Sequence, residues 1–182
     1  LEELAAGGRP YRFGDIHHTQ EDGARMVSTP PYTAYLKIAE GCDNHCAYCV
    51  IPSLRGRYRS RTLESLLTEA QTLADSGVQE LIVIAQDITR YGADLYGRRM
   101  LGELLRKLCR LPFHWIRLHY LYPDEVDEEL IEVLASEHKI LRYLDLPLQH
   151  INDGILKAMN RRSTKAEVLA LLARLREKLP GL

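Results

Sequence analysis

The chain has 182 residues, of which 46% are hydrophobic and 27% are charged, a composition that is ordinary for one soluble globular domain. No apolar run approaches the roughly 18 residues needed to cross a bilayer, and the first residues lack the basic and apolar regions of a signal peptide. We therefore expect a cytoplasmic protein. The formal net charge is −1, so the overall charge gives no indication of a nucleic-acid partner, whose binding domains are usually strongly basic.

Residues 1–32 show no sustained hydrophobic period and contain Gly7-Gly8 and Pro30-Pro31. Because Gly and Pro punctuate loops, this stretch is predicted to be a linker or a strap over the core. The adjacent His17 and His18 could bind a metal, but we interpret them as part of a solvated loop and place no site there. The chain begins without Met and ends in helix-like sequence, so we expect a fragment of a longer protein.

From residue 33 onward, strand-like and helical patterns alternate. We expect strands at 35–39, 80–85, 115–121 and 141–148, and helices at 63–76, 101–111, 127–136, 152–159 and 164–179. Continuous apolar runs such as ELIVIA at 80–85 are typical of buried parallel strands. The alternation predicts an α/β fold, either a barrel of the TIM type or a doubly wound sheet. Four strands cannot close a barrel, so residues 33–182 are expected to form an incomplete core.

The first predicted strand runs into a C-x3-C-x2-C loop formed by Cys42, Cys46 and Cys49. In parallel α/β folds, reactive groups gather where strands end and the following loops begin. Cysteines clustered in this way in a cytosolic chain indicate a metal site rather than disulfides. The spacing lets one short loop wrap an iron-sulfur cluster with three thiolates. A cubane cluster held in this way keeps one iron open to a substrate or cofactor.

A structural zinc site is the main rival for these cysteines. Such a site normally closes four ligands in a tetrahedron and uses two separated ligand pairs. His45 is the nearby fourth candidate, but it is the sequence neighbour of Cys46, and the chain contains no second C-x2-C pair. Incidental buried cysteines are the other alternative. The spacing favours a cluster over both.

The loop resembles the signature of radical S-adenosylmethionine (SAM) enzymes, because an aromatic residue, Tyr48, precedes the third cysteine. Further segments look like the methylthiotransferases, and within them like the RimO type. These segments are residues 32–42 (YTAYLKIAEGC), 55–61 (RGRYRSR), 85–87 (AQD), 89–92 (TRYG) and 146–153 (LPLQHIND). The similarity extends over about residues 25–179.

The resemblance implies a partial TIM-type barrel of the radical SAM kind, truncated at its C-terminal side. It also implies a 4Fe-4S cluster on Cys42, Cys46 and Cys49, with S-adenosyl-L-methionine chelating the open iron. One electron, delivered by a donor such as flavodoxin, would then cleave the sulfonium bond and yield a radical that abstracts hydrogen. By the same resemblance, Tyr48 would pack against the adenine, the alternative being an ordinary core tyrosine.

The RimO type adds a methylthio group to the β-carbon of an aspartate in small-subunit ribosomal protein twelve. Relatives that modify tRNA more often show Gly-Gln-Asn after the second strand and Gln-Ser-Gly-Ser after the fourth. This chain has Ala-Gln-Asp at 85–87 and Gln-His-Ile-Asn at 149–152. Both differences favour a protein substrate. A tRNA adenosine methylthiotransferase core and a noncatalytic zinc or iron-sulfur module remain as alternatives.

Further cofactor contacts are expected where the other strands end. Gln86 and Asp87 could hold the amino group of the cofactor, although Asp87 could instead cap a turn. Arg117 could meet the cofactor carboxylate from the barrel interior, or it could reach solvent at a strand edge. Gln149 could contact the ribose or carboxylate. His150 could do so too, or could instead lie at the start of the next helix.

Arg55, Arg57, Arg59 and Arg61 recur at every second residue. An extended backbone would project all four from one face. The resulting positive stripe could bind an acidic substrate, an RNA phosphate or the cofactor carboxylate, or it could simply be solvated.

Two parts of the full family pattern are not found in this sequence. They are an N-terminal domain with a second, three-cysteine 4Fe-4S cluster thought to deliver sulfur, and a C-terminal β-barrel domain of the TRAM type that helps to bind substrate. We therefore expect the chain by itself to bind one cluster without completing methylthiolation.

Overall fold

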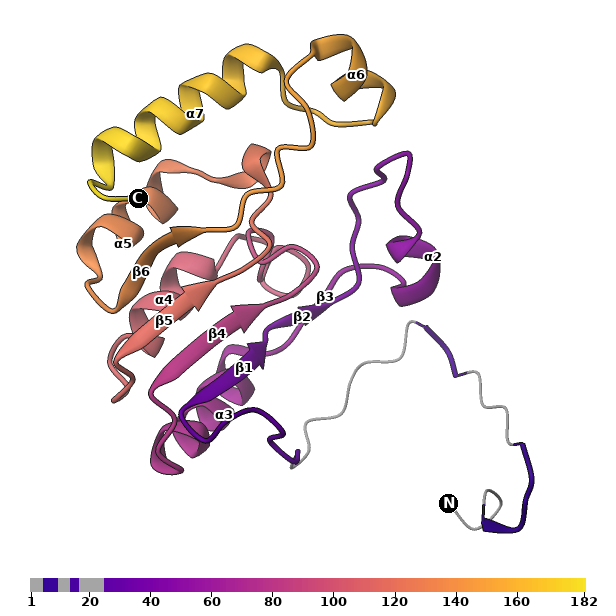
Figure 1. Ribbon diagram of the computed structural model, residues 1–182, viewed down its shortest axis with the longest axis vertical. Coiled ribbons are helices and arrows are strands. Elements are labelled where there is room, and N and C mark those ends of the chain that lie inside the picture. The colour runs from indigo at the N-terminus through magenta and orange to yellow at the C-terminus, as the bar shows by residue number, and fades with distance from the viewer. Residues whose placement is uncertain (1–4, 10–13, 17–24) are drawn as a thin grey trace.

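The protein is described by a computed structural model that covers residues 5–9, 14–16 and 25–182. Its centre is a parallel sheet with strand order β1-β4-β5-β6 (Figure 1). The strands are β1 (Thr33–Lys37), β4 (Glu80–Ile84), β5 (Trp115–Leu118) and β6 (Ile140–Leu144). A short antiparallel ribbon of β2 (Ala39–Glu40) and β3 (Arg59–Ser60) flanks the loop that carries Cys42, Cys46 and Cys49. The expected pair His17-His18 lies outside the described residues.

Helices follow the strands along the chain. They are α2 (Ile51–Arg55), α3 (Leu63–Asp75), α4 (Leu101–Leu108), the 3-10 turn η1 (Pro123–Glu125), α5 (Glu128–Ser136), α6 (Asp153–Ala158) and α7 (Lys165–Lys178). Several begin at a capping side chain. Thr62, Asp127, Asn152 and Thr164 each accept a hydrogen bond from a backbone N–H of the first turn, which satisfies a donor that the helix leaves unpaired.

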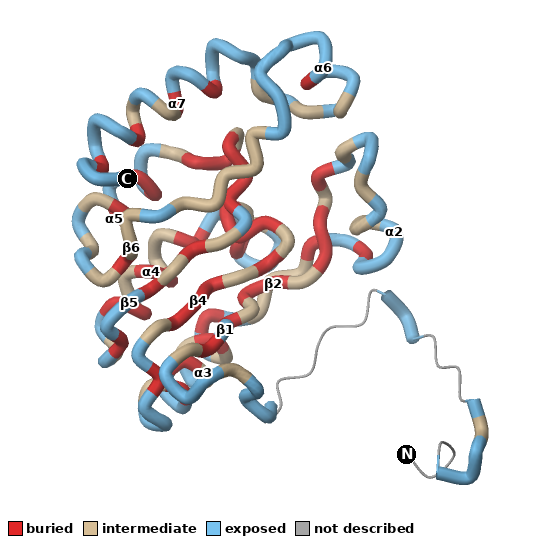
Figure 2. Tube along the Cα trace, viewed as in Figure 1, coloured by how far each residue is buried: buried red, intermediate tan, exposed pale blue. Residues whose placement is uncertain are grey.

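Buried and more exposed residues alternate along β1 and β5, whereas the three central residues of β4 are all buried (Figure 2). Along β1 and its neighbours, alternate residues such as Leu36, Leu81 and Leu118 are fully buried in the hydrophobic core. Tyr35 and Trp115, on the opposite face, are exposed. A doubly wound sheet would bury both faces under helices. The α/β prediction is thus confirmed, and the arrangement is that of a partial TIM-type barrel whose inner face is open in the described residues.

Two strands end earlier than the apolar pattern predicts. β5 ends at Leu118 rather than at 121, because Tyr120 adopts a left-handed backbone with φ 64°. β6 ends at Leu144 rather than at 148, and the chain then passes through Pro147, which has no N–H to donate, and the left-handed Gln149 at φ 67°. The first strand also differs, because the expected run divides into β1 and β2. At these interruptions the chain leaves the sheet and enters the loops that follow the strands.

In the described part of the chain, no helix is both long and apolar enough to cross a membrane.

Candidate functional site

A cavity of about 420 Å³ lies at the carboxyl end of the sheet. Cys42, Cys46 and Cys49 all line it. Its other walls come from the segments that follow β4, β5 and β6 and from the turn after α6, and they include Ala85, Gln86, Tyr120, Tyr122, Pro147, Gln149 and Arg161. The cavity therefore occupies the place where parallel α/β folds gather their reactive groups.

The loop of residues 42–49, here called the cysteine loop, is shaped by local backbone contacts. Gly41 enters it with a φ of 80°, in the region that favours glycine. The backbone N–H of Asn44 points to Cys42 Sγ at 3.4 Å, and the N–H of Cys49 donates to the Cys46 carbonyl at 3.0 Å. None of the three cysteines forms a disulfide. Burial raises the pKa of the Cys42 thiol, and the N–H of Asn44 opposes that shift.

The arrangement of the three cysteines can be compared with the two metal chemistries expected from the sequence. Within the described residues, no group of three His, Cys, Asp or Glu side chains converges as the ligands of one metal ion would. A tetrahedral zinc site requires such convergence. In a cubane, each thiolate binds a different iron, so the sulfurs stay apart around a shared space. Three free thiols around one cavity are the arrangement that a 4Fe-4S cluster needs.

Gln86 and Asp87, which follow β4, differ in their surroundings and in their hydrogen bonds. Gln86 lines the cavity, and its buried Oε1 accepts no hydrogen bond from any described residue. An unpartnered buried acceptor fits an ammonium donor. Asp87 is 1% exposed and accepts hydrogen bonds from Asn44 Nδ2 at 2.7 Å and from the N–H and hydroxyl of Thr89. Burial raises its pKa. Asp87 thus caps its turn, which was the alternative interpretation of this residue, and it also contacts the cysteine loop through Asn44.

Tyr48 is 50% exposed at the mouth of the cavity. Its hydroxyl accepts a hydrogen bond from Arg161 Nη2 at 3.0 Å. The Arg161 guanidinium lies 4.5 Å from the ring centroid of Tyr122, and the Tyr122 hydroxyl lies 3.9 Å from Cys46 Sγ. Burial raises the pKa of Tyr122 to about 12. Half of the Tyr48 surface is thus available to a ligand, and the tyrosine is not an ordinary core residue.

Of the three remaining residues predicted to contact the cofactor, one lines the cavity and two do not. Gln149 lines the cavity. The ring of His150 instead accepts a hydrogen bond from the Asn152 N–H at 2.9 Å, at the start of α6. Arg117 is not among the residues that line the cavity. Its Nε donates to Glu80 Oε1 at 2.6 Å, so its anionic partner is a carboxylate of the neighbouring strand.

The prediction of one positive stripe is wrong for two of its four arginines. Arg61 binds Glu69 and donates to the Ser65 hydroxyl at 2.7 Å. Arg59 donates to the backbone carbonyls of residues 55 and 57, bracing the turn before β3. Arg55 and Arg57 remain exposed. The backbone is not extended over the whole stretch, because Arg55 ends α2 and Gly56 has a φ of 73°.

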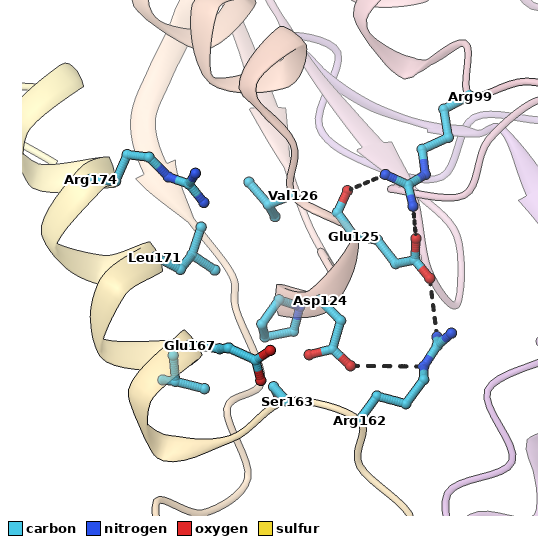
Figure 3. Close-up of a pocket in the computed structure, with 11 residues that line it drawn as sticks. Arg99, Asp124, Glu125, Val126, Arg162, Ser163, Glu167, Leu171 and Arg174 are labelled. Carbon is cyan, nitrogen blue, oxygen red and sulfur yellow. Dashed lines mark hydrogen bonds and ion pairs between the residues drawn. The ribbon is translucent and has the colours of Figure 1, made fainter.

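Sequence reasoning missed Asn44, Tyr122 and the pair Arg161-Arg162. The signal available for the arginines was two adjacent cations in the short turn between two predicted helices. Arg162 also borders a second cavity of about 450 Å³, between η1 and α7, where it contacts Asp124 and Glu125 (Figure 3).

The sequence matches the Radical SAM superfamily over residues 36–181. It is 49% identical to the ribosomal protein uS12 methylthiotransferase RimO of Lachnoclostridium phytofermentans, over 100% of this chain and 42% of that protein. It is 55% identical to the enzyme of the same name from Geobacter sulfurreducens, over 100% of this chain and 41% of that protein. The chain thus spans about two fifths of the length of these curated relatives.

Among solved structures, the fold is similar to that of TsrM, a radical S-adenosylmethionine methyltransferase from Kitasatospora setae. The TM-score is 0.65 at 21% identity, covering 86% of this chain and 32% of that one. At that identity the likeness shows the fold alone. The extent of the family match, together with the cysteine loop and the partial barrel, establishes that the chain belongs to the radical SAM superfamily.

Proposed function

We propose that this chain is the cluster-binding core of a methylthiotransferase that modifies an aspartate of ribosomal protein uS12. The observation that carries the proposal is the set of three free thiols around one cavity at the carboxyl end of the sheet. Relatives at about half identity that are named for this activity support the choice of reaction.

Membership of the superfamily implies a 4Fe-4S cluster and S-adenosylmethionine, which when bound supply one-electron cleavage of the sulfonium bond. Cys42, Cys46 and Cys49 would hold the cluster. Gln86 would accept a hydrogen bond from the amino group of the cofactor, because its buried Oε1 otherwise has no donor among the described residues. Tyr48 and Gln149 would line the cofactor at the mouth of the cavity.

Asp87 and Arg117 are left out of this cofactor set. The carboxylate of Asp87 already accepts three hydrogen bonds, from Asn44 and Thr89. Arg117 is neutralised by Glu80. Both side chains would have to give up protein partners in order to bind a ligand, and a buried polar group left without a partner is destabilising.

The sulfur for a methylthio group would come from a second cluster, as in the resemblance noted above. The sequence contains Cys109 besides the cysteine loop, and that residue is buried in the core. One cysteine cannot provide a second three-cysteine set. The second cluster and an electron donor such as flavodoxin would therefore be supplied from outside these residues.

A protein substrate is preferred over tRNA. Of the residues that distinguish the sequence from tRNA-modifying relatives, Ala85 lines the cavity. The positive stripe that could have bound RNA is reduced, because Arg59 and Arg61 bond within the protein and Arg55 Nε lies 3.9 Å from Glu40 Oε1. Fewer free cations weaken binding to phosphates.

The test uses the chain after anaerobic reconstitution, with SAM and a reductant. We measure 5′-deoxyadenosine in the presence of uS12, of tRNA or of neither. Greater production with uS12 than with tRNA supports the proposal. Stimulation by tRNA alone would favour the tRNA methylthiotransferase, and absence of 5′-deoxyadenosine under all three conditions would contradict radical chemistry. Mass spectrometry of uS12 tests the further expectation that this chain alone does not complete the transfer.

A further inference from the structure

The turn between α6 and α7 is hydrogen-bonded to the cysteine loop. Each of the four consecutive residues 159–162, here called the clamp, forms one hydrogen bond with that loop. The bonds join Ala47 N to Met159 O (3.0 Å), Asn160 Nδ2 to His45 O (2.6 Å), Arg161 Nη2 to Tyr48 Oη (3.0 Å) and Arg162 Nη2 to Asn44 Oδ1 (2.9 Å). Segments more than 100 residues apart in sequence are thus joined at the cluster site.

The clamp is held from both sides. Asn160 closes α6 with a left-handed φ of 56°, a conformation that Asn adopts more readily than most residues. α7 begins at Thr164, which forms a capping box with Glu167. Leu171 and Leu175 then bury α7 in the core. The position of the clamp is therefore set by the fold rather than by the cysteine loop that it contacts.

Arg162 is the member of the clamp with the most extensive support. Its Nη2 also donates to Glu125 Oε1 at 3.0 Å, and its Nε lies 3.8 Å from Asp124 Oδ2. Glu125 is 8% exposed and is held from its other side by Arg99 (Figure 3). The two carboxylates therefore help to hold the Arg162 guanidinium in the orientation in which it donates to Asn44. Charge-assisted bonds of this kind are stronger than neutral ones.

Asn44 transmits that support to a cluster ligand. It is 6% exposed, and its amide is fixed at both ends, by Arg162 at Oδ1 and by Asp87 at Nδ2. Its backbone N–H points to Cys42 Sγ at 3.4 Å. The orientation of this N–H therefore depends on the side chain that the clamp holds.

We propose that Arg162 is a positioning residue that acts through Asn44 to direct a backbone N–H onto the Cys42 sulfur. This inference rests on the proposed cluster ligation. Hydrogen bonds to cluster sulfurs help to set the reduction potential. Because an N–H donor stabilises the more negative, reduced cluster, loosening Asn44 lowers the potential, and the reduced state becomes harder to reach.

The test compares the reconstituted chain with Arg162→Gln, Asn44→Ala and the double variant. Arg106→Gln is the matched control, because Arg106 forms an exposed ion pair with Glu129 on the helical side of the sheet. The readouts are iron per chain, the unfolding midpoint in urea, and the reduction potential from a titration followed by electron paramagnetic resonance. Arg162→Lys is the conservative variant, since an ammonium can still donate to both Asn44 and Glu125.

We expect Arg162→Gln and Asn44→Ala each to lower the equilibrium constant for cluster reduction about tenfold, or about 59 mV for one electron. The double variant should match Asn44→Ala alone, because coupled residues are not additive. Arg162→Lys should recover part of the shift, and Arg106→Gln should show none.

An unchanged potential in Arg162→Gln, or additive shifts in the double variant, would overturn the inference. If Arg162→Gln does not fold, the same decision rests on Asn44→Ala and Arg162→Lys. Failure of the native chain to bind a cluster would instead contradict the proposed function, so the two failures are distinguishable.

Discussion

Gly41→Ala tests the shape of the cysteine loop directly. Gly41 has a φ of 80°, and a Cβ at this position would lie 2.7 Å from the carbonyl carbon of Arg57 and from the carbonyl oxygen of Gly56. The neighbours are backbone atoms, so a rotamer change cannot relieve the clash. The left-handed backbone costs about 1–2 kcal/mol for a residue with a Cβ, and overpacking adds about 1–3 kcal/mol.

Gly77→Ala provides the control for this substitution. Gly77 also has a positive φ, of 94°, but no atom of the described structure lies within 4 Å of the position of its Cβ. That variant should lose only the backbone component. Urea unfolding should therefore show Gly41→Ala less stable than Gly77→Ala by about 1–3 kcal/mol, and iron per chain should fall only for Gly41→Ala. Equal stability and equal iron content in the two variants would refute the packing described around Gly41.

Three further outcomes are expected. Thr164→Ala, which removes the cap of α7, should lower the unfolding free energy by about 1 kcal/mol. An unchanged unfolding free energy in urea denaturation would contradict the capping box. Leu104→Ala should cost about 2–5 kcal/mol because Leu104 is fully buried, and a loss well below 1 kcal/mol would contradict that burial. Burial raises the pKa of Cys109 from 9.0 to about 12, so the folded state favours its neutral thiol. As pH rises from 9.0 to about 12, the unfolding free energy of the unmutated chain should therefore fall more than that of Cys109→Ala. If the unfolding free energies of the two proteins fell in parallel with pH, the raised pKa of Cys109 would be contradicted.

Much of the fold could be predicted from the sequence because its signals are local. The helix over 63–76 is found as Leu63–Asp75, and the strand over 80–85 as Glu80–Ile84. Apolar spacing and capping residues lie within the segments that they specify. The strand ends were less predictable, because β5 stops where Tyr120 turns left-handed, and nothing in an apolar run marks that change.

The candidate site shows the same division. The spacing of Cys42, Cys46 and Cys49 is local, and all three line one cavity, while their binding of a cluster stays a prediction. The partner of Arg117 could not be known, because Glu80 comes from a different strand and meets it only through the sheet register. Contacts between the clamp and the cysteine loop depend likewise on the fold that brings residues 159–162 to the loop.

We propose that Cys42, Cys46 and Cys49 hold a cluster with one iron open to S-adenosylmethionine. The most direct test is anaerobic reconstitution of the chain with iron and sulfide, followed by electron paramagnetic resonance of the reduced protein with and without the cofactor. We predict about 4 irons per chain and a reduced signal that shifts when S-adenosylmethionine is added. A colourless protein that retains tightly bound zinc would contradict the claim.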